Sequence, residues 1–411
     1  MHKKSAFLLQ SISFLLERPT LFALLKPYLW WLQWKNPFPT LAQFSYRITL
    51  ENVLTLYGRK KPVVWASLFF PAEFIYALDG APFYPEITAG LFSALGVGAI
   101  PLFHAESHFF SADLCSYHRL SVGASMLRFF PRPDFLCATS GICRETVPFF
   151  QTLAELFGVP LYLVDIPHEF SPKTVRYVAS QLRSIAQNLK RDRRVTWDFE
   201  RPFELAQKTQ TVLQEIEALR RKKEVMILPP TKNLDYLPYY YQFMGSETSL
   251  SFFQKLRDEL RQNPKNPLPH RLLWLHLKPF YSNFLSALLT ELGLGIAFEE
   301  FAATYSGELK PKEPFQGLAE KITVMSHALM DEKARIARIL QWVSEYQTEG
   351  VIQFNQWGCR QSQGMNALLR KTLRGEGVPV LFLDGDHIDR RHHTEEQWRT
   401  RLQAFAEMLG G

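Results

Sequence analysis

The sequence contains few cysteines: four among 411 residues, and no Cys-x-x-Cys pair. So few thiols cannot form a disulfide framework, so we expect a reducing, cytoplasmic compartment and thiols kept for metal binding or chemistry. The missing Cys-x-x-Cys pairs argue against zinc ribbons, thioredoxin chemistry and the compact ferredoxin spacing.

The sequence also lacks an apolar run long enough to span a bilayer. Lys3 and Lys4 precede a short apolar run that is similar to a signal peptide, but Glu17 and Arg18 interrupt it and no small-residue cleavage site follows. We therefore expect no cleaved signal and no membrane association, and we interpret residues 1–60 as an N-terminal helical segment.

The net charge of +7 makes nucleic acid a partner to consider, with basic clusters at Lys190–Arg194 and Arg220–Lys223. Both clusters lie in or beside patterns rich in Gln, Glu and Leu, where a charge run is usually the solvated face of a helix. We therefore expect no nucleic-acid binding. Phosphorylated small molecules or an acidic protein partner remain compatible with the charge.

Short apolar runs alternate with helical patterns in the first half of the chain. Residues 61–67, 81–84, 134–139 and 161–165 have the composition of buried strands, and residues 71–78 and 144–157 have helical periodicity. This alternation, with Gly and Pro between the elements, predicts a mostly parallel sheet flanked by helices. Residues 171–223 are long, charged and helical in pattern, as in a helical insertion or a lid.

The second half repeats this design after the proline-rich stretch 262–269, which we interpret as a linker. Strands are predicted at 271–277, 295–298, 351–354 and 378–383, and helices at 282–292, 333–346, 362–373 and 395–409. The sequence thus predicts an α/β protein with two Rossmann-like domains, at 61–262 and 270–411. Ligands of such open sheets bind beyond the carboxyl ends of the strands.

Two cysteines occupy that position. Cys143 and Cys359 each follow a predicted strand and precede a helix, where the helix dipole favours a thiolate. Cys115 lies in a segment suited to a loop or a helix start, whereas Cys137 alternates within an apolar strand and is most simply a buried core residue. Three thiolates from two domains would suit an iron–sulfur cluster in the cleft between them.

The chain resembles one family along most of residues 60–409. The blocks that carry the resemblance are "KKPVVWASLFFPAEFIYALDGAPFYP", "LCSYHRLSVGA", "DFLCATSGICRETVPFFQTLAELFGVPLYLVDIP" and "GVIQFNQWGCRQSQGMNALLRKTLRGEGVPVLFLDGDHIDRRHHTEEQWRTRLQAFAEML". They are similar to the family that unites 2-hydroxyacyl-CoA dehydratase component D, subunits of ATP-dependent benzoyl-CoA reductase, and double-cubane-cluster proteins.

The resemblance implies a cofactor, partners and site residues. Cys115, Cys143 and Cys359 match the family's ligands of a [4Fe-4S] cluster with one open iron. Subunits of this family pair as homodimers or heterodimers, and a separate ATP-hydrolysing iron–sulfur activator supplies one low-potential electron. The double-cubane branch needs more ligands than this chain has, because only Cys137 is left over.

The resemblance also implies the chemistry. The β-hydrogen of an acyl-CoA thioester is not acidic, but one added electron makes a ketyl radical anion that expels the α-hydroxide, after which a base takes the β-proton and the electron returns. We therefore expect a 2-hydroxyacyl-CoA dehydratase. The alternatives are an ATP-dependent reductase subunit and a non-catalytic, cluster-bearing partner subunit.

Further residues near these motifs are candidates for catalysis. Glu73 starts a predicted helix and can serve as an acid or base or as a partner of the helix dipole. Arg144 and Arg360 directly follow two of the cysteines, where a cation would stabilise a reduced cluster, although backbone or carboxylate contacts explain them equally well. His387, His392 and His393 lie in a polar segment and favour surface or substrate-edge roles.

Overall fold

The computed structural model describes residues 40–193, 197–262, 267–303, 305, 307–392 and 395–410. Its strands form two separate four-stranded sheets in which every neighbouring pair is parallel. The strands are β1 (Val63–Ala66), β2 (Ala81–Phe83), β3 (Phe135–Thr139), β4 (Leu161–Val164), β5 (His270–Leu275), β6 (Leu294–Glu299), β7 (Gly350–Gln356) and β8 (Val380–Gly385).

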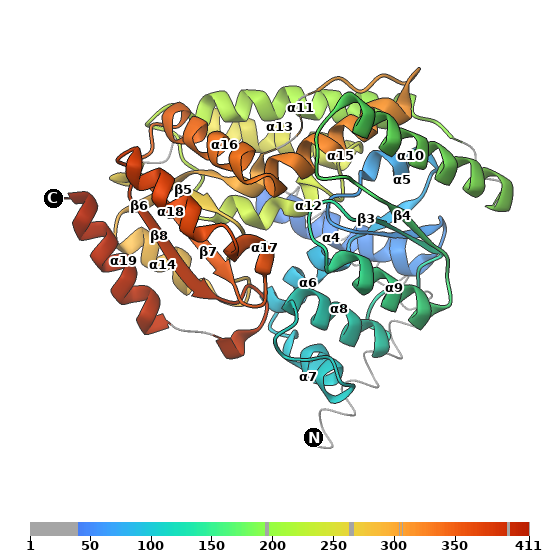
Figure 1. Cartoon of the computed structure of the whole chain (residues 1–411), viewed down its shortest axis with the longest axis horizontal. Coiled ribbons are helices and arrows are strands. Elements are labelled where there is room, and N and C mark those ends of the chain that lie inside the picture. Colours follow the sequence, from blue (N-terminus) through green and yellow to red (C-terminus); the bar gives the residue numbers. More distant parts are fainter. Residues whose placement is uncertain are drawn as a thin grey trace.

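Both sheets have the same topology, β2-β1-β3-β4 in the first and β6-β5-β7-β8 in the second. Every residue of β1, β3, β6 and β7 is buried, which is typical of parallel sheets that helices cover on both faces. Figure 1 shows the two sheets in separate halves of the molecule. The predicted fold class, α/β with two Rossmann-like units, is confirmed.

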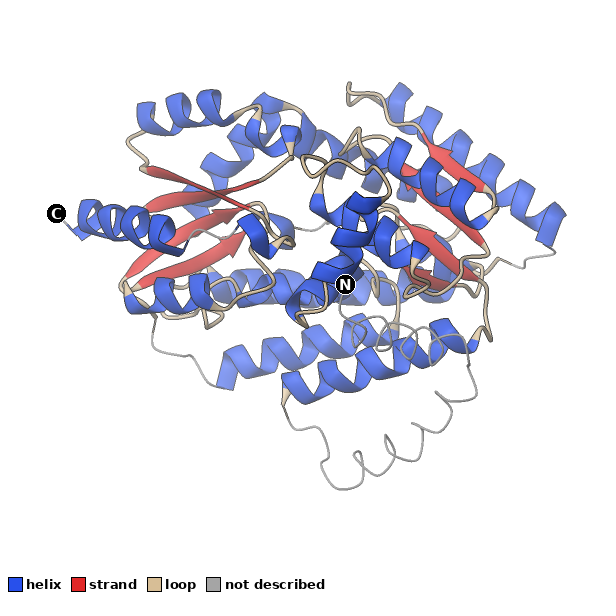
Figure 2. Ribbon diagram, turned by 90° about the horizontal axis from the view of Figure 1, so that it is seen from below, coloured by secondary structure: helices blue, strands red, loops and turns tan. Residues whose placement is uncertain are grey.

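Helices make the parallel crossovers and cover the sheets (Figure 2). They are α4 (Leu41–Gly58), α5 (Ala72–Ala77), α6 (Pro85–Ala94), α7 (Ala99–Ser107), α8 (Ser116–Met126), α9 (Thr146–Phe157), α10 (Pro172–Arg193), α11 (Glu200–Arg220), α12 (Leu237–Tyr240), α13 (Glu247–Gln262), α14 (Phe284–Glu291), α15 (Pro314–Met330), α16 (Glu332–Glu345), α17 (Arg360–Gln363), α18 (Asn366–Gly375) and α19 (Glu395–Gly410). Short 3₁₀ turns are η1 (Lys232–Tyr236), η2 (Glu300–Ala302) and η3 (Arg390–His392). Among the residues just described, no helix is both long and apolar enough to cross a membrane.

The predicted elements differ from the observed ones in a few places. The helical segment at 171–223 is confirmed as α10 and α11, and α4 confirms a helix over the described part of the N-terminal segment. The helix predicted at 362–373 is divided into α17 and α18, because Gly364, a poor helix former, interrupts it. Residues 1–39 and the centre of the predicted linker, 263–266, lie outside the described residues, and the domain boundaries stay predictions.

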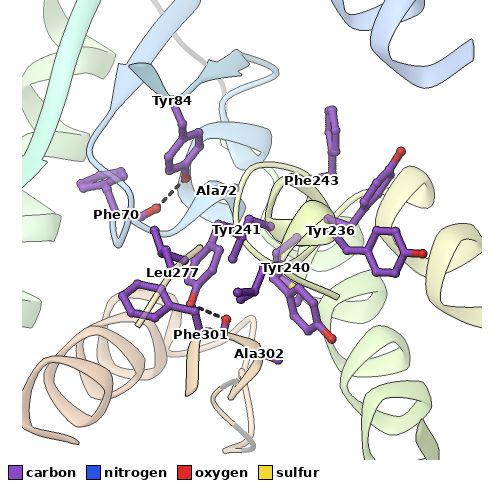
Figure 3. Packing of buried hydrophobic residues seen from close by; sticks show 14 of the residues in the cluster. Phe70, Ala72, Tyr84, Tyr236, Tyr240, Tyr241, Phe243, Leu277, Phe301 and Ala302 are labelled. Atoms are coloured by element: carbon purple, nitrogen blue, oxygen red, sulfur yellow. Dashed lines mark hydrogen bonds between the residues drawn. The ribbon is translucent and has the colours of Figure 1, made fainter. Parts of the chain in front are cut away.

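Aromatic side chains between the two sheets join the halves into one continuous core. Figure 3 shows Tyr241, from the segment after α12, beside Phe301 of the second half, whose carbonyl oxygen accepts the tyrosine hydroxyl at 2.9 Å. In the first half, the hydroxyl of Tyr84 donates to the carbonyl oxygen of Phe70 at 2.6 Å. Satisfied hydroxyls let these large rings be buried without a desolvation penalty. The two sheets are therefore held in a definite relation to each other.

Candidate functional site

The central strands of both sheets end at one internal cavity of about 140 Å³. Ser67 follows β1, Thr139 ends β3, His276 follows β5 and Gln356 ends β7, and all four line this cavity. In each sheet the chain changes direction between these two central strands, and such switch points are where doubly wound sheets bind ligands. We call this space the inner cavity.

Three cysteines line the inner cavity. Cys115 is the N-cap residue of α8, Cys143 lies in the loop between β3 and α9, and Cys359 is the N-cap residue of α17. Cys137 is fully buried in β3, which confirms its prediction as a core residue. The structure thus brings together the three thiols that the sequence singled out and leaves the fourth apart.

The loop that carries Cys359 packs tightly against the segment before Cys115. Gly358 has a φ of +76°, and a Cβ atom at this position would lie 2.6 Å from the carbonyl oxygen of Asp113. Only glycine combines this left-handed conformation with so close an approach. Gly358 therefore lets the two cysteine loops, which belong to different halves of the chain, lie in contact.

The three thiols differ in acidity. Burial and, to a lesser degree, the neighbouring thiols raise the pKa of Cys115 well above its usual value and that of Cys143 to about 11. Burial acts in the same direction on Cys359, but a hydrogen bond and positive charge from His276 outweigh it and lower its pKa to about 7. Binding of a cationic group would therefore have to displace protons from at least two thiols.

The donor set has the chemistry of an iron–sulfur site. Three thiols from the two halves of the chain line one cavity, and cysteine thiolates are the ligands that hold iron–sulfur clusters. Cys115, Cys143 and Cys359 are therefore the residues that could hold such a cluster.

A buried ion pair forms part of the wall of the inner cavity, next to His276. The guanidinium of Arg335 binds both carboxylate oxygens of Glu300, at 2.5 and 2.8 Å, and both residues line the inner cavity. Glu300 also accepts the backbone N–H of His276 at 3.0 Å. His276 has a φ of +70°, an uncommon conformation for a residue other than glycine, and this contact helps to hold it toward Cys359.

Glu86, near the start of α6, is a buried carboxylic acid with a raised pKa. It lines the inner cavity, and its Oε2 atom is buried without a hydrogen-bond partner. Burial raises its pKa to about 7, against the opposing effect of hydrogen bonds from the backbone of Glu86 and Leu68. A carboxyl group with this pKa exchanges protons readily at neutral pH.

A second, larger cavity of about 540 Å³ adjoins the first. The two share Leu68, Glu86, Tyr117 and Leu277 as wall residues. We call this space the outer cavity. Apolar and aromatic side chains dominate its lining, so it suits a long, mostly apolar ligand whose reactive end reaches the thiols.

The other predicted catalytic residues are not among those that line the inner cavity. Glu73 is fully buried in α5 and pairs with Lys321 of α15 at 2.5 Å, and Arg144 and Arg360 are exposed, with Arg144 contacting His168. None of the three lines the cavity, and their catalytic roles stay predictions.

The histidine segment after β8 is placed differently from the expectation. The expected surface role of His387 is wrong, because it is fully buried against Phe354. Its substrate-edge role stays a prediction. Only His392, stacked on Trp357, is partly exposed, and His393 lies outside the described residues.

Glu86 and His276 were not among the site residues predicted from the sequence. His276 directly follows β5, and Glu86 lies shortly after β2, so both carry the strand-end signal that selected Cys143 and Cys359. Glu300 directly follows β6 and carries the same strand-end signal, whereas Arg335, in the first turn of α16, carries none. The two residues meet only when the chain is folded.

The chain is similar to one known protein family along most of its length. The model of the family described as "2-hydroxyglutaryl-CoA dehydratase, D-component" matches residues 67–409. The chain is 25% identical to the (R)-phenyllactyl-CoA dehydratase alpha subunit of Clostridium sporogenes, over 85% of this chain and 90% of that protein.

Two further relatives have names that describe other activities. The (R)-2-hydroxyisocaproyl-CoA dehydratase alpha subunit of Clostridioides difficile is 23% identical over 85% of this chain and 90% of its own length. A benzoyl-CoA reductase subunit of Thauera aromatica is 19% identical over 74% of this chain and 78% of its own length. With the family match spanning most of the described fold, the chain belongs to the 2-hydroxyglutaryl-CoA dehydratase D-component family, as the resemblance implied.

Proposed function

We propose that this protein is the iron–sulfur subunit of a 2-hydroxyacyl-CoA dehydratase. The observation that carries the proposal is the meeting of Cys115, Cys143 and Cys359 at one cavity that also contains Glu86. The three thiols would hold a [4Fe-4S] cluster with one open iron, and such a cluster would supply one low-potential electron and a Lewis acid to an acyl thioester.

The chain's own side chains provide the remaining functions. Glu86 accepts a substrate proton, because its pKa of about 7 leaves much of it ionised at neutral pH, and burial keeps it unsolvated. His118 stacks on Phe149 and has its pKa lowered by burial to about 4, so it stays neutral. Among the titratable side chains that line this cavity, Glu86 is thus the better matched to proton transfer.

The outer cavity would hold the pantetheine arm of the acyl-CoA, since it is largely apolar and adjoins the cavity that the thiols line. The expected partners are an ATP-hydrolysing iron–sulfur activator, which delivers the electron, and a second subunit in a homodimer or heterodimer. The dehydratase alpha subunits among the relatives support this assignment.

The test is the iron and sulfide content, with electron paramagnetic resonance, of anaerobically purified protein and of Cys115→Ala, Cys143→Ala and Cys359→Ala variants. We expect about four irons per chain, lost in each of the three variants. The matched control is Cys137→Ala, which removes a buried thiol from β3 and should keep the cluster. Absence of a cluster after reconstitution would overturn the proposal.

The second candidate is an ATP-dependent reductase subunit, which the similarity to the benzoyl-CoA reductase subunit of Thauera aromatica supports. Electron stoichiometry separates the two. A dehydratase recycles its electron, so activator and reductant act in catalytic amounts, whereas a reductase consumes electrons with each product. A non-catalytic subunit would hold the cluster and show no spectral change with any acyl-CoA.

A further inference from the structure

Three charged side chains form a compact group on the wall of the outer cavity. The ammonium group of Lys278 lies 2.6 Å from one carboxylate oxygen of Asp235, and that of Lys232 lies 2.9 Å from the other. All three residues line the cavity. The two lysines lower the pKa of Asp235 despite its burial, so the carboxyl group is ionised at neutral pH.

The group carries one positive charge in excess, because two ammonium groups share one carboxylate. The remaining charged side chain among the described residues that line the outer cavity is Glu86, whose pKa of about 7 leaves it partly protonated. Lys278 is only 8% exposed, so little water screens its charge. A weakly screened positive charge in an apolar cavity favours an anionic ligand group.

One loop connects this group to the thiols. Three consecutive residues follow β5. His276 hydrogen-bonds Cys359, and Leu277 lines both cavities. Lys278 is one of the two lysines that pair with Asp235. A ligand that reaches the thiols past Leu277 therefore places its other end near Lys278 and Lys232.

We propose that Lys278 and Lys232 bind an oxyanion, phosphate or carboxylate, on the substrate whose thioester occupies the inner cavity. This inference rests on the proposed function, because it takes the ligand to be an acyl thioester. The anion has two possible sources, the phosphate of the pantetheine arm or a carboxylate of the acyl group. Asp235 acts as a positioning residue that orients both ammonium groups toward the cavity.

The test compares binding of charged and neutral ligands to the anaerobically purified full-length protein by isothermal titration calorimetry. Phosphopantetheine against pantetheine tests the phosphate, and glutaryl-pantetheine against pentanoyl-pantetheine tests the carboxylate. In one of these pairs we expect the anion to bind about ten- to a hundredfold more tightly, as for a charge-assisted hydrogen bond. Lys278→Met should bring this ratio close to one by weakening the binding of the anionic ligand.

Further variants separate charge from structure. Lys232→Met alters a more exposed side chain and should reduce the ratio of affinities with less risk to folding. Lys278→Arg keeps the positive charge and should therefore preserve the ratio. The matched control is Lys61→Met, which breaks an exposed pair with Asp79 far in sequence from this wall and should change nothing.

The outcomes distinguish the two proposals. A ratio near one in the wild-type protein, or one that survives both methionine variants, would overturn the oxyanion site while leaving the dehydratase proposal intact. If neither pantetheine nor any of its derivatives binds, the proposed function fails and the oxyanion site falls with it.

Discussion

At the scale of single residues, the site depends on groups held away from their ordinary protonation states. Glu86 is kept partly neutral by burial, and Cys359 is kept acidic by His276. The raised pKa of Glu86 costs stability once the carboxyl group ionises, because burial disfavours the charged form. Glu86 is therefore a position at which stability and activity should conflict.

Glu86→Gln should show this conflict. In the folded protein the pKa of Glu86 is raised above its unfolded value of 4.5 to about 7, so the folded state binds more protons between these values and stability falls as pH rises through them. A neutral glutamine does not lose stability as pH rises. The variant should therefore be more stable than the wild-type protein by about 3 kcal/mol at pH 8, and no more stable than it below pH 4.

Urea unfolding of both proteins across this pH range measures the effect. Turnover with an acyl-CoA should fall about a hundredfold or more even though the variant is more stable. Equal stability of the two proteins at pH 8 would contradict the burial of an ionisable Glu86.

At the scale of elements, a buried polar cluster holds the start of α8 against the ends of β7 and β8. The hydroxyl of Ser116 donates to Asp386 at 2.6 Å, and the side-chain amide of Gln356 donates to the Ser116 oxygen at 2.9 Å. Ser116 adjoins Cys115, and Gln356 lies three residues before Cys359. The contacts therefore set the spacing of two cysteines that belong to different halves.

Ser116→Ala should loosen this junction. The Gln356 amide would lose its partner in a buried place, which costs about 1 to 3 kcal/mol. The matched control is Ser125→Ala in the same helix, where the buried hydroxyl bonds only the carbonyl of Ser121 within α8. Urea unfolding should show a clearly larger loss for Ser116→Ala. Labelling of metal-free protein with a thiol reagent should modify Cys115 and Cys359 faster in that variant alone.

At the scale of the whole molecule, ion pairs bridge the two halves. Glu73 of α5 pairs with Lys321 of α15, and Arg119 of α8 pairs with Asp389 after β8 at 3.3 Å and with Glu106. Arg119 and Asp389 are each 1% exposed. A buried charge that loses its partner is strongly destabilising, so these pairs favour one relative placement of the halves.

Lys321→Met should therefore destabilise the protein by about 3 to 5 kcal/mol, because Glu73 is left buried without its cation. The double variant Glu73→Gln/Lys321→Met should recover most of the loss, since no charge then remains. Denaturant midpoints measure both effects. The double variant also tests the sequence-based role of Glu73: full turnover would make it structural, and lost turnover in a stable protein would support it as a catalytic acid or base.

Local patterns were sufficient for the architecture and for part of the site. All eight strands were predicted to within two residues at their starts, because continuous apolar runs between Gly and Pro leave little alternative in a parallel sheet. Cys143 and Cys359 were recognised because a strand end followed by a helix start is itself a local signal. Glu86 and His276 carried the same signal and were passed over.

Short-range preferences along the sequence are enough to predict two parallel sheets, the helices over them, and thiols at the carboxyl edges of the sheets. Folding is needed to bring three cysteines from two halves to one cavity, to bury His387, and to let Lys278 and Lys232 share Asp235. Burial, pKa and ion pairing depend on neighbours far along the chain, and those neighbours are brought together only by packing.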